Sequence, residues 1–118
     1  MDSIIVEGQN KLEGEVTVGG AKNAVLALMP ACILAPGRNK YTNVPDLADV
    51  RTMIKLLRIL GAEVEFQDGT LIIDSTRLNK WVAPYELVKT MRASVLVLGP
   101  LTAMFGRSRV SLPGGCAI

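Results

Sequence analysis

Three positions in this 118-residue chain place a charged or reactive group where a small anionic ligand could bind. Lys22 follows the Gly19-Gly20 pair and opens an apolar stretch, and Arg92 stands before a second apolar run. Cys116 follows Pro113-Gly114-Gly115. A cation in apolar surroundings needs solvent, an acidic partner or an anionic ligand, and a thiol in a glycine-rich loop is often accessible. All three positions are therefore candidates for a binding or catalytic site.

The segment Gly19-Gly20-Ala21-Lys22-Asn23 lies where a strand is expected to lead into a helix. Glycines let the backbone approach a ligand, the first turn of a helix has unpaired N–H groups, and Lys22 adds a positive charge. This combination suits a phosphate or a carboxylate. Glycine pairs are also common in ordinary turns, and the segment matches neither the Walker pattern nor GxGxxG.

Two further features each allow a functional and a structural interpretation. Arg92, with Lys89 one helical turn earlier, could present a planar fork to ligand phosphates, or both could lie on a solvated helix face. Cys116 would gain thiolate character beside a cation, whereas Cys32, within an apolar run, is expected to be an inert core residue.

Composition excludes several functional classes. The chain has no histidine, which removes Ser-His and Cys-His pairs and His-containing metal motifs, and we expect neither a metal nor a cofactor. A net charge of +2 and 4% aromatic residues give little reason to expect a nucleic acid partner. The longest apolar run, residues 24–35, is shorter than the roughly 20 residues that span a bilayer. Unpaired cysteines and the lack of a signal sequence favour the cytoplasm.

The residue pattern predicts short strands that alternate with helices. In the first half we expect strands at 4–6, 14–18 and 41–44, and a helix over 21–35 that is buried nearly all round and kinked at Pro30. A second helix is expected from its cap at Asp46 to Leu60, with Gly61 as its C-terminal cap. Its apolar residues recur at helical spacing.

In the second half, segments 62–66 and 71–74 flank a polar turn that contains Asp68-Gly69 and are expected to form a hairpin. Pro84 is expected to start a third helix, which is bent near Gly99-Pro100 and runs to Phe105 before a strand at 110–112.

The chain also shows internal similarity at a spacing of 69 residues. Ala24 then aligns with Ala93, Leu26 with Val95, and Gly37-Arg38 with Gly106-Arg107. The first copy continues into a helix and a hairpin, while the second stops before its corresponding helix, so the chain holds about one and a half βαβαββ units. Charged residues make up only 20% and hydrophobic residues 49%, which suggests a piece of a larger core.

Three segments carry a resemblance to a known family: residues 19–24, residues 83–94 and residues 110–118. Together they resemble the N-terminal part of the bacterial UDP-N-acetylglucosamine 1-carboxyvinyltransferases, an enolpyruvyl transferase family. The resemblance implies an α/β (α+β) fold, an inverse α/β barrel of repeated βαβαββ units. It implies that residues 1–21 are strands that belong to or link with a second domain. Residues 22–118 would then be the first part of the catalytic repeat domain, ending in the active-site loop.

The resemblance also implies an activity. Such enzymes transfer the enolpyruvyl group of phosphoenolpyruvate to the 3-hydroxyl of UDP-N-acetylglucosamine and release phosphate, the first committed step of peptidoglycan synthesis. Lys22 and Asn23 match phosphoenolpyruvate contacts, and Arg92 matches a contact with the nucleotide sugar or the nearby phosphate. Cys116 matches the loop thiol that protonates the enol carbon and is alkylated by fosfomycin.

Some expected parts lie outside the sequence. The family's Arg-Pro pair after the loop and its aspartate base are not among these residues, so the chain alone is expected to be inactive and to need the remainder of the enzyme. A shikimate-pathway enolpyruvyl transferase is the nearest alternative, although a Ser-Lys-Ser type motif would be expected at Gly20-Ala21-Lys22-Asn23. A non-catalytic fragment of the same fold is a second alternative.

Overall fold

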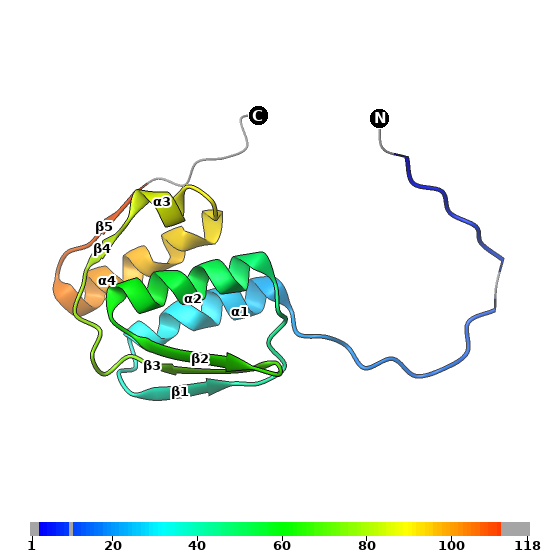
Figure 1. Cartoon of the computed structure of the whole chain (residues 1–118), viewed down its shortest axis with the longest axis horizontal. Helices are drawn as coiled ribbons and strands as arrows, with labels where there is room; N and C mark the ends of the chain where they lie inside the picture. Colours follow the sequence, from blue (N-terminus) through cyan, green and yellow to red (C-terminus); the bar gives the residue numbers. More distant parts are fainter. Residues whose placement is uncertain (1–2, 10, 112–118) are drawn as a thin grey trace.

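The computed structural model describes residues 3–9 and 11–111. They form a layer of packed helices, called the helical layer below, and two small sheets (Figure 1). The first helical stretch is α1 (Lys22–Leu28), which continues as the 3₁₀ helix η1 (Met29–Ile33). The amphipathic helix α2 (Ala48–Leu60) packs on it. After the short helix α3 (Tyr85–Val88), a second stretch consists of the 3₁₀ helix η2 (Arg92–Val97) and α4 (Leu98–Phe105). The mixed helix and sheet class agrees with the sequence prediction.

An antiparallel sheet with strand order β1-β3-β2 covers one side of these helices. It consists of β1 (Arg38–Tyr41), β2 (Glu63–Gln67) and β3 (Thr70–Asp74), with Lys40 and Glu65 both opposite Ile72. The turn between β2 and β3 has positive φ at both Asp68 (47°) and Gly69 (72°), as a two-residue type I′ hairpin requires. The predicted hairpin is confirmed.

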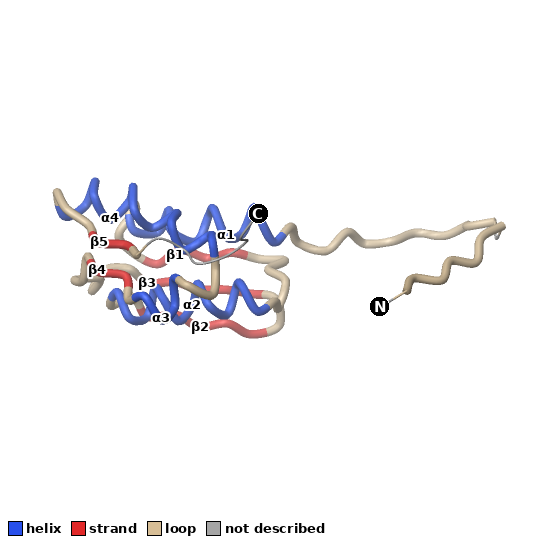
Figure 2. The backbone as a smooth tube through the Cα atoms, turned by 90° about the horizontal axis from the view of Figure 1, so that it is seen from above, coloured by secondary structure: helices blue, strands red, loops and turns tan. Residues whose placement is uncertain are grey.

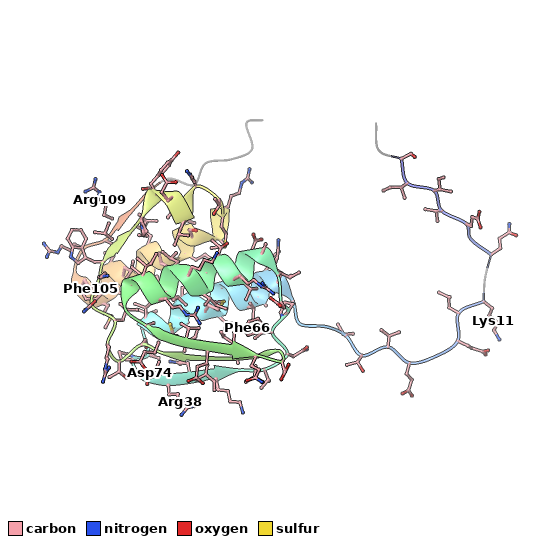
Figure 3. The ribbon with its side chains drawn as sticks, in the orientation of Figure 1. Lys11, Arg38, Phe66, Asp74, Phe105 and Arg109 are labelled. Atoms are coloured by element: carbon pink, nitrogen blue, oxygen red, sulfur yellow. The ribbon has the colours of Figure 1, made fainter. Side chains whose placement is uncertain are left out.

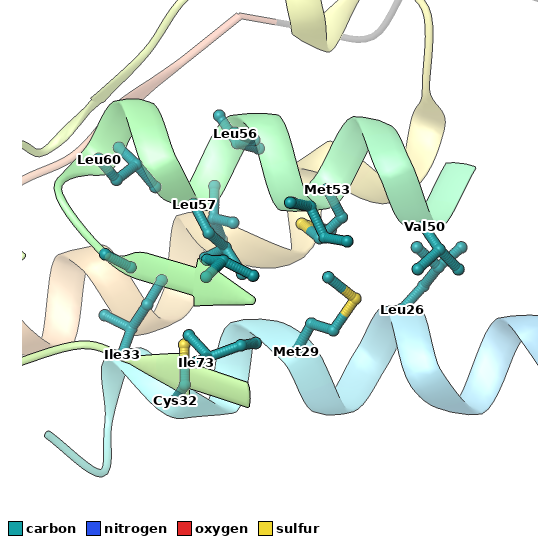
Figure 4. Packing of buried hydrophobic residues seen from close by; sticks show 14 of the residues in the cluster. Leu26, Met29, Cys32, Ile33, Val50, Met53, Leu56, Leu57, Leu60 and Ile73 are labelled. Carbon is teal, nitrogen blue, oxygen red and sulfur yellow. The ribbon is translucent and has the colours of Figure 1, made fainter. Parts of the chain in front are cut away.

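The core lies between the sheet, α2 and the first helical stretch (Figure 4). Met29 and Leu57 are fully buried within it, and Leu26 lies beside Val50. The apolar α2 residues at helical spacing are buried, namely Val50, Met53, Ile54, Leu57 and Leu60, whereas Ile59 is 39% exposed. Gly61 ends α2 in the left-handed conformation (φ 108°), where its N–H is donated to the carbonyls of Leu57 and Arg58.

The first helical stretch differs from the prediction in two ways. It is α-helical only to Leu28 and continues as a 3₁₀ helix, because Pro30 has no N–H to donate to the carbonyl four residues earlier. It is also not buried all round, since Leu28 and Leu34 are 52% and 57% exposed. One face of this stretch therefore has no neighbour among the described residues.

Two predicted boundaries before α2 were wrong. The strand expected at 41–44 is β1, three residues earlier, because Asn43 takes a left-handed conformation (φ 56°) that ends the extended run. Asp46 does not cap α2, because Leu47 occupies that position and the Asp46 carboxylate binds Arg51 instead.

The helix expected over 84–105 breaks at residues 89–91 and not at Gly99-Pro100. Met91 is extended (φ −146°) and buried, which separates α3 from η2. Pro100 lies in the first turn of α4, where a missing N–H costs little. Gly106 ends α4 as predicted (φ 68°) and donates its N–H to the Thr102 carbonyl.

Strands β4 (Val82–Ala83) and β5 (Arg109–Val110) form a parallel pair that the second helical stretch connects. The strand predicted at 110–112 is thus present from Arg109, while Leu112 lies outside the described residues. Figure 2 shows this pair at the end of the molecule opposite the N-terminal segment.

The strands expected at 4–6 and 14–18 are absent from residues 3–9 and 11–21, which run as an extended loop away from the other elements (Figure 2). Their apolar side chains are exposed, with Ile4 at 92% and Val16 at 89%. A strand forms only where a neighbour pairs with its backbone, and the described residues offer this segment none.

The two copies of the repeat lie side by side in the same direction, since α1 packs against η2 and η1 packs against α4. The N-terminal ends of both stretches therefore lie at the same end of the helical layer, together with the start of α2 (Figure 1). This arrangement places Lys22 and Arg92 at that shared end.

Candidate functional site

Gly20 fixes the approach of the chain to α1. A Cβ atom on Gly20 would lie 1.7 Å from the Asn43 carbonyl oxygen and 3.1 Å from Cδ of Pro45, so no other residue fits. The Asn43 side chain also donates to the Val18 carbonyl (3.4 Å). The sequence predicted that the glycine pair lets the backbone approach a ligand. For Gly20 the close neighbour is instead this turn of the same chain, and Gly19 has open space around it.

Lys22 is the first residue of α1, and its ammonium binds the carboxylate of Asp49. The Nζ to Oδ2 distance is 2.8 Å, and the two side chains are 45% and 36% exposed. Asp49 lies in the first turn of α2, so the ion pair joins the starts of the two helices. Of the three surroundings expected for Lys22, the structure shows an acidic partner that leaves the cation accessible to solvent.

A shallow hollow lies beside this ion pair. It is lined by Lys22, Leu47, Ala48 and Asp49, and Leu47 is itself 42% exposed. An ammonium has three N–H donors, and one is used by Asp49, so two can still donate to ligand oxygens. Asn23 follows on the same turn of α1 and is exposed. Lys22 and Asn23 are thus both exposed at this end of the helical layer, next to the Asp49 carboxylate, and their role in binding stays a prediction.

Arg92 and Lys89, which the sequence grouped together, have different surroundings. Arg92 begins η2 and is exposed at the shared end of the helical layer. Lys89 pairs with Glu86 one turn earlier, and its Nζ lies 5.5 Å from the centroid of the Tyr85 ring. The hydrogen bond and the charge of Glu86 raise the pKa of Lys89. Lys89 thus belongs to a solvated helix face, whereas the role of Arg92 stays a prediction.

The two cysteines also differ in what the structure says of them. Cys32 is fully buried, and desolvation raises the pKa of its thiol to about 11, as expected for an inert core residue. Cys116 and the preceding Pro113-Gly114-Gly115 lie outside the described residues. Its predicted role is therefore argued from the sequence alone.

A second group of charged side chains lies on the outer face of the sheet, where Figure 3 labels Arg38 and Asp74. Arg77 binds Glu63 (3.3 Å), and the pKa of Asp74 is lowered, chiefly by hydrogen bonds from Thr76 and less by the charges of Arg38 and Arg77. The charges of these two cations and two carboxylates offset one another. Among residues 3–9 and 11–111, no three acidic or thiol groups are placed to hold a metal ion.

Sequence reasoning missed Asp49 as the partner of Lys22. Asp49 lies in the first turn of α2, and 27 positions separate it from Lys22. A lysine beside an apolar stretch needs an acidic neighbour, and this was the available signal. Several carboxylates of the chain could have met that need equally well.

No helix in the described part of the chain is long and apolar enough to cross a membrane.

Comparison with known proteins shows the family of this chain. A family model described as EPSP synthase (3-phosphoshikimate 1-carboxyvinyltransferase) matches residues 6–118. The chain belongs to the EPSP synthase family. Among solved structures of enolpyruvyl transferases, it is similar to NikO from Streptomyces tendae, with a TM-score of 0.72 and 25% identity. That match covers 84% of this chain and 23% of NikO, so the described elements form part of an EPSP synthase family fold.

Curated relatives in the EPSP synthase family match the whole chain. It is 60% identical over 118 residues to the UDP-N-acetylglucosamine 1-carboxyvinyltransferase of Trichlorobacter lovleyi. The proteins of that name from Geobacter metallireducens and a Psychrobacter species are 58% and 55% identical. The chain spans only 27% to 28% of the length of these relatives. The predicted resemblance is confirmed, and the chain corresponds to an N-terminal part of such proteins.

Proposed function

We propose that this chain is the N-terminal part of an enzyme that transfers the enolpyruvyl group of phosphoenolpyruvate to the 3-hydroxyl of UDP-N-acetylglucosamine. The observation that carries the proposal is 55–60% identity over all 118 residues to curated relatives named for this activity. Phosphate is the second product. The reaction would serve peptidoglycan synthesis, and through it cell shape and division, in the cytoplasm.

Lys22 and Asn23 are proposed to bind phosphoenolpyruvate, and Arg92 to bind the nucleotide sugar or the adjacent phosphate. Support comes from the exposed position of all three residues at one end of the helical layer. Cations there would offset the charge on the phosphate and carboxylate of the substrate as the tetrahedral intermediate forms.

Cys116 is proposed to supply a proton. As the sugar oxygen bonds to the central carbon of the enol, the methylene carbon takes the thiol proton and becomes a methyl group. An aspartate in the remainder of the enzyme would accept the hydroxyl proton. Loss of phosphate with return of the methyl proton then yields the enol ether, so atoms and charge balance. A thiol suits this acid role in a chain that has no histidine.

Residues 1–21 are proposed to belong to or link with the second domain. The support is the exposure of their β-branched and leucine side chains, such as Val6 (82%), Leu12 (91%) and Val18 (80%). Alternating apolar residues of this kind are typical of a half-buried strand. Burial against the remainder of the enzyme would remove these side chains from water.

The proposal is tested with the full-length enzyme by phosphate release from phosphoenolpyruvate. Release is expected with UDP-N-acetylglucosamine and not with shikimate 3-phosphate, and the reverse would favour the shikimate-pathway alternative that the family description names. Lys22→Met is expected to lower kcat/KM for phosphoenolpyruvate by roughly a hundredfold or more with an unchanged Tm. Cys116→Ala should lower kcat by about a hundredfold or more and remove inactivation by fosfomycin.

If the wild-type full-length protein releases no phosphate with either acceptor, the result would favour a non-catalytic protein of the same fold. If Lys22→Met instead lowers Tm sharply and leaves the affinity for phosphoenolpyruvate unchanged, Lys22 is structural and its proposed role in substrate binding is wrong.

A further inference from the structure

The ion pair between Lys22 and Asp49 is built from two different helices. Lys22 is the first residue of α1 and Asp49 lies in the first turn of α2, so the 2.8 Å contact joins the starts of the two helices. Both side chains keep a third or more of their surface exposed, and exposed ion pairs contribute little to stability. The more specific consequence is geometric, because a lysine side chain is flexible and a carboxylate within hydrogen-bond distance restricts where its ammonium can lie.

The neighbouring carboxylate cannot take over this role. Asp46 lies three residues earlier and binds Arg51 through both oxygens, at 2.6 Å to Nε and 2.5 Å to Nη2. The hydrogen bond from Arg51 lowers the pKa of Asp46. Asp46 and Asp49 are therefore two carboxylates at one helix end with different partners, and their side chains are 52% and 36% exposed.

We propose that Asp49 is a positioning residue for Lys22 in the reaction proposed above. Asp49 accepts one hydrogen bond from Nζ beside the hollow that Lys22, Leu47, Ala48 and Asp49 itself line, and two N–H groups of the ammonium remain for an anionic substrate. Without this carboxylate the ammonium would sample many positions, and the substrate would have to order it on binding. The inference rests on the proposed function, because it assumes that Lys22 binds phosphoenolpyruvate.

The experiment compares four variants of the full-length enzyme: Asp49→Ala, Asp49→Glu, Lys22→Met and the control Asp46→Ala. Asp49→Ala is expected to lower kcat/KM for phosphoenolpyruvate by about tenfold to a hundredfold through a raised KM. The KM for the nucleotide sugar should stay unchanged. Asp49→Glu should restore part of the loss, and Asp46→Ala should resemble the wild type in both KM values.

A double-mutant comparison shows whether Asp49 acts through Lys22. In the Lys22→Met background, Asp49→Ala should have little further effect on kcat/KM. Independent effects that multiply would overturn the inference. So would an Asp49→Ala enzyme that loses Tm but keeps its KM for phosphoenolpyruvate, or one that raises both KM values equally.

Failure of this inference is distinct from failure of the proposed function. If the wild type releases phosphate and Lys22→Met loses phosphoenolpyruvate affinity while Asp49→Ala does not, only the positioning role is wrong. If the wild type releases no phosphate with UDP-N-acetylglucosamine, the proposed function itself fails.

Discussion

The two helical stretches that align at a spacing of 69 residues share an apolar pattern but have different neighbours. In the first stretch, Leu26 and Met29 are 3% and 0% exposed, with α2 packed over them (Figure 4). Their counterparts in the second stretch, Val95 and Leu98, are both 41% exposed. The reverse holds for Leu28 and its counterpart Val97, which are 52% and 0% exposed, so the two aligned stretches bury different faces.

The helix types also differ between the two stretches. The first is α-helical and then 3₁₀, whereas the second is 3₁₀ and then α-helical. Each stretch has one proline, and both lie in the first turn that follows the change of helix type, Pro30 in η1 and Pro100 in α4. The two stretches therefore differ in the order of their helix types but run in the same direction.

The largest expected effect separates Met29 from Leu98 in the 118-residue chain. Met29→Ala should lower the free energy of unfolding by about 2–5 kcal/mol, because it leaves a cavity in a fully buried position. Leu98→Ala should cost less than about 1 kcal/mol, because that side chain already contacts water. Urea denaturation measures both. Equal costs would mean that another part of the molecule covers Leu98 in solution.

A smaller effect is expected from the two buried serines. The Ser75 hydroxyl donates to the Cys32 carbonyl (2.7 Å), whereas the Ser94 hydroxyl has no partner within the described part of the chain. Ser75→Ala should cost about 1–3 kcal/mol because it leaves a buried carbonyl unpaired. Ser94→Ala should be neutral or slightly stabilising. Thermal unfolding of the two variants measures both changes in stability. A clear loss of stability in Ser94→Ala would show that this hydroxyl is hydrogen-bonded in solution.

The smallest effect concerns pH and the thiol of Cys32, whose counterpart in the second stretch, Leu101, cannot titrate. Burial raises the pKa of Cys32 from 9.0 to about 11, so the folded state holds this proton more tightly than the unfolded state. Its contribution to stability is complete below pH 9 and is lost as pH rises toward 11. Stability measured from pH 8 to 11 should fall less steeply in Cys32→Val. Identical slopes would contradict the expected shift.

Elements with strong local signals could be predicted from the sequence. The apolar spacing of α2 identified its buried face, Asp68-Gly69 identified the hairpin, and Gly61 and Gly106 identified two helix ends. Elements that depend on distant neighbours could not. The break at Met91 has no Pro or Gly signal, because it arises from burial of that side chain in the core. Residues 14–18 have strand propensity, but no segment within 3–9 or 11–111 pairs with them.

For the candidate site too, local signals could be predicted from the sequence and contacts between distant residues could not. The types and local settings of Lys22 and Arg92 marked them as anion-binding candidates, and the parallel packing of the two stretches brings their helix starts to one end. The contact with Asp49 depends on how α1 lies against α2, which no local pattern encodes. The sequence predicted a close approach at Gly20 but took the neighbour to be a ligand. The neighbour is the backbone of Asn43, which comes close only in the folded chain.

The parallel arrangement of the two stretches has an evolutionary consequence. When a unit is duplicated in tandem and the copies pack side by side in one direction, every residue at the start of one helix acquires a twin at the same end of the molecule. Lys22 and Arg92 differ by one position from such a twin relationship. A protein built in this way can gather several cations at one end by copying a single unit, and mutation can then assign each copy to a different part of a ligand.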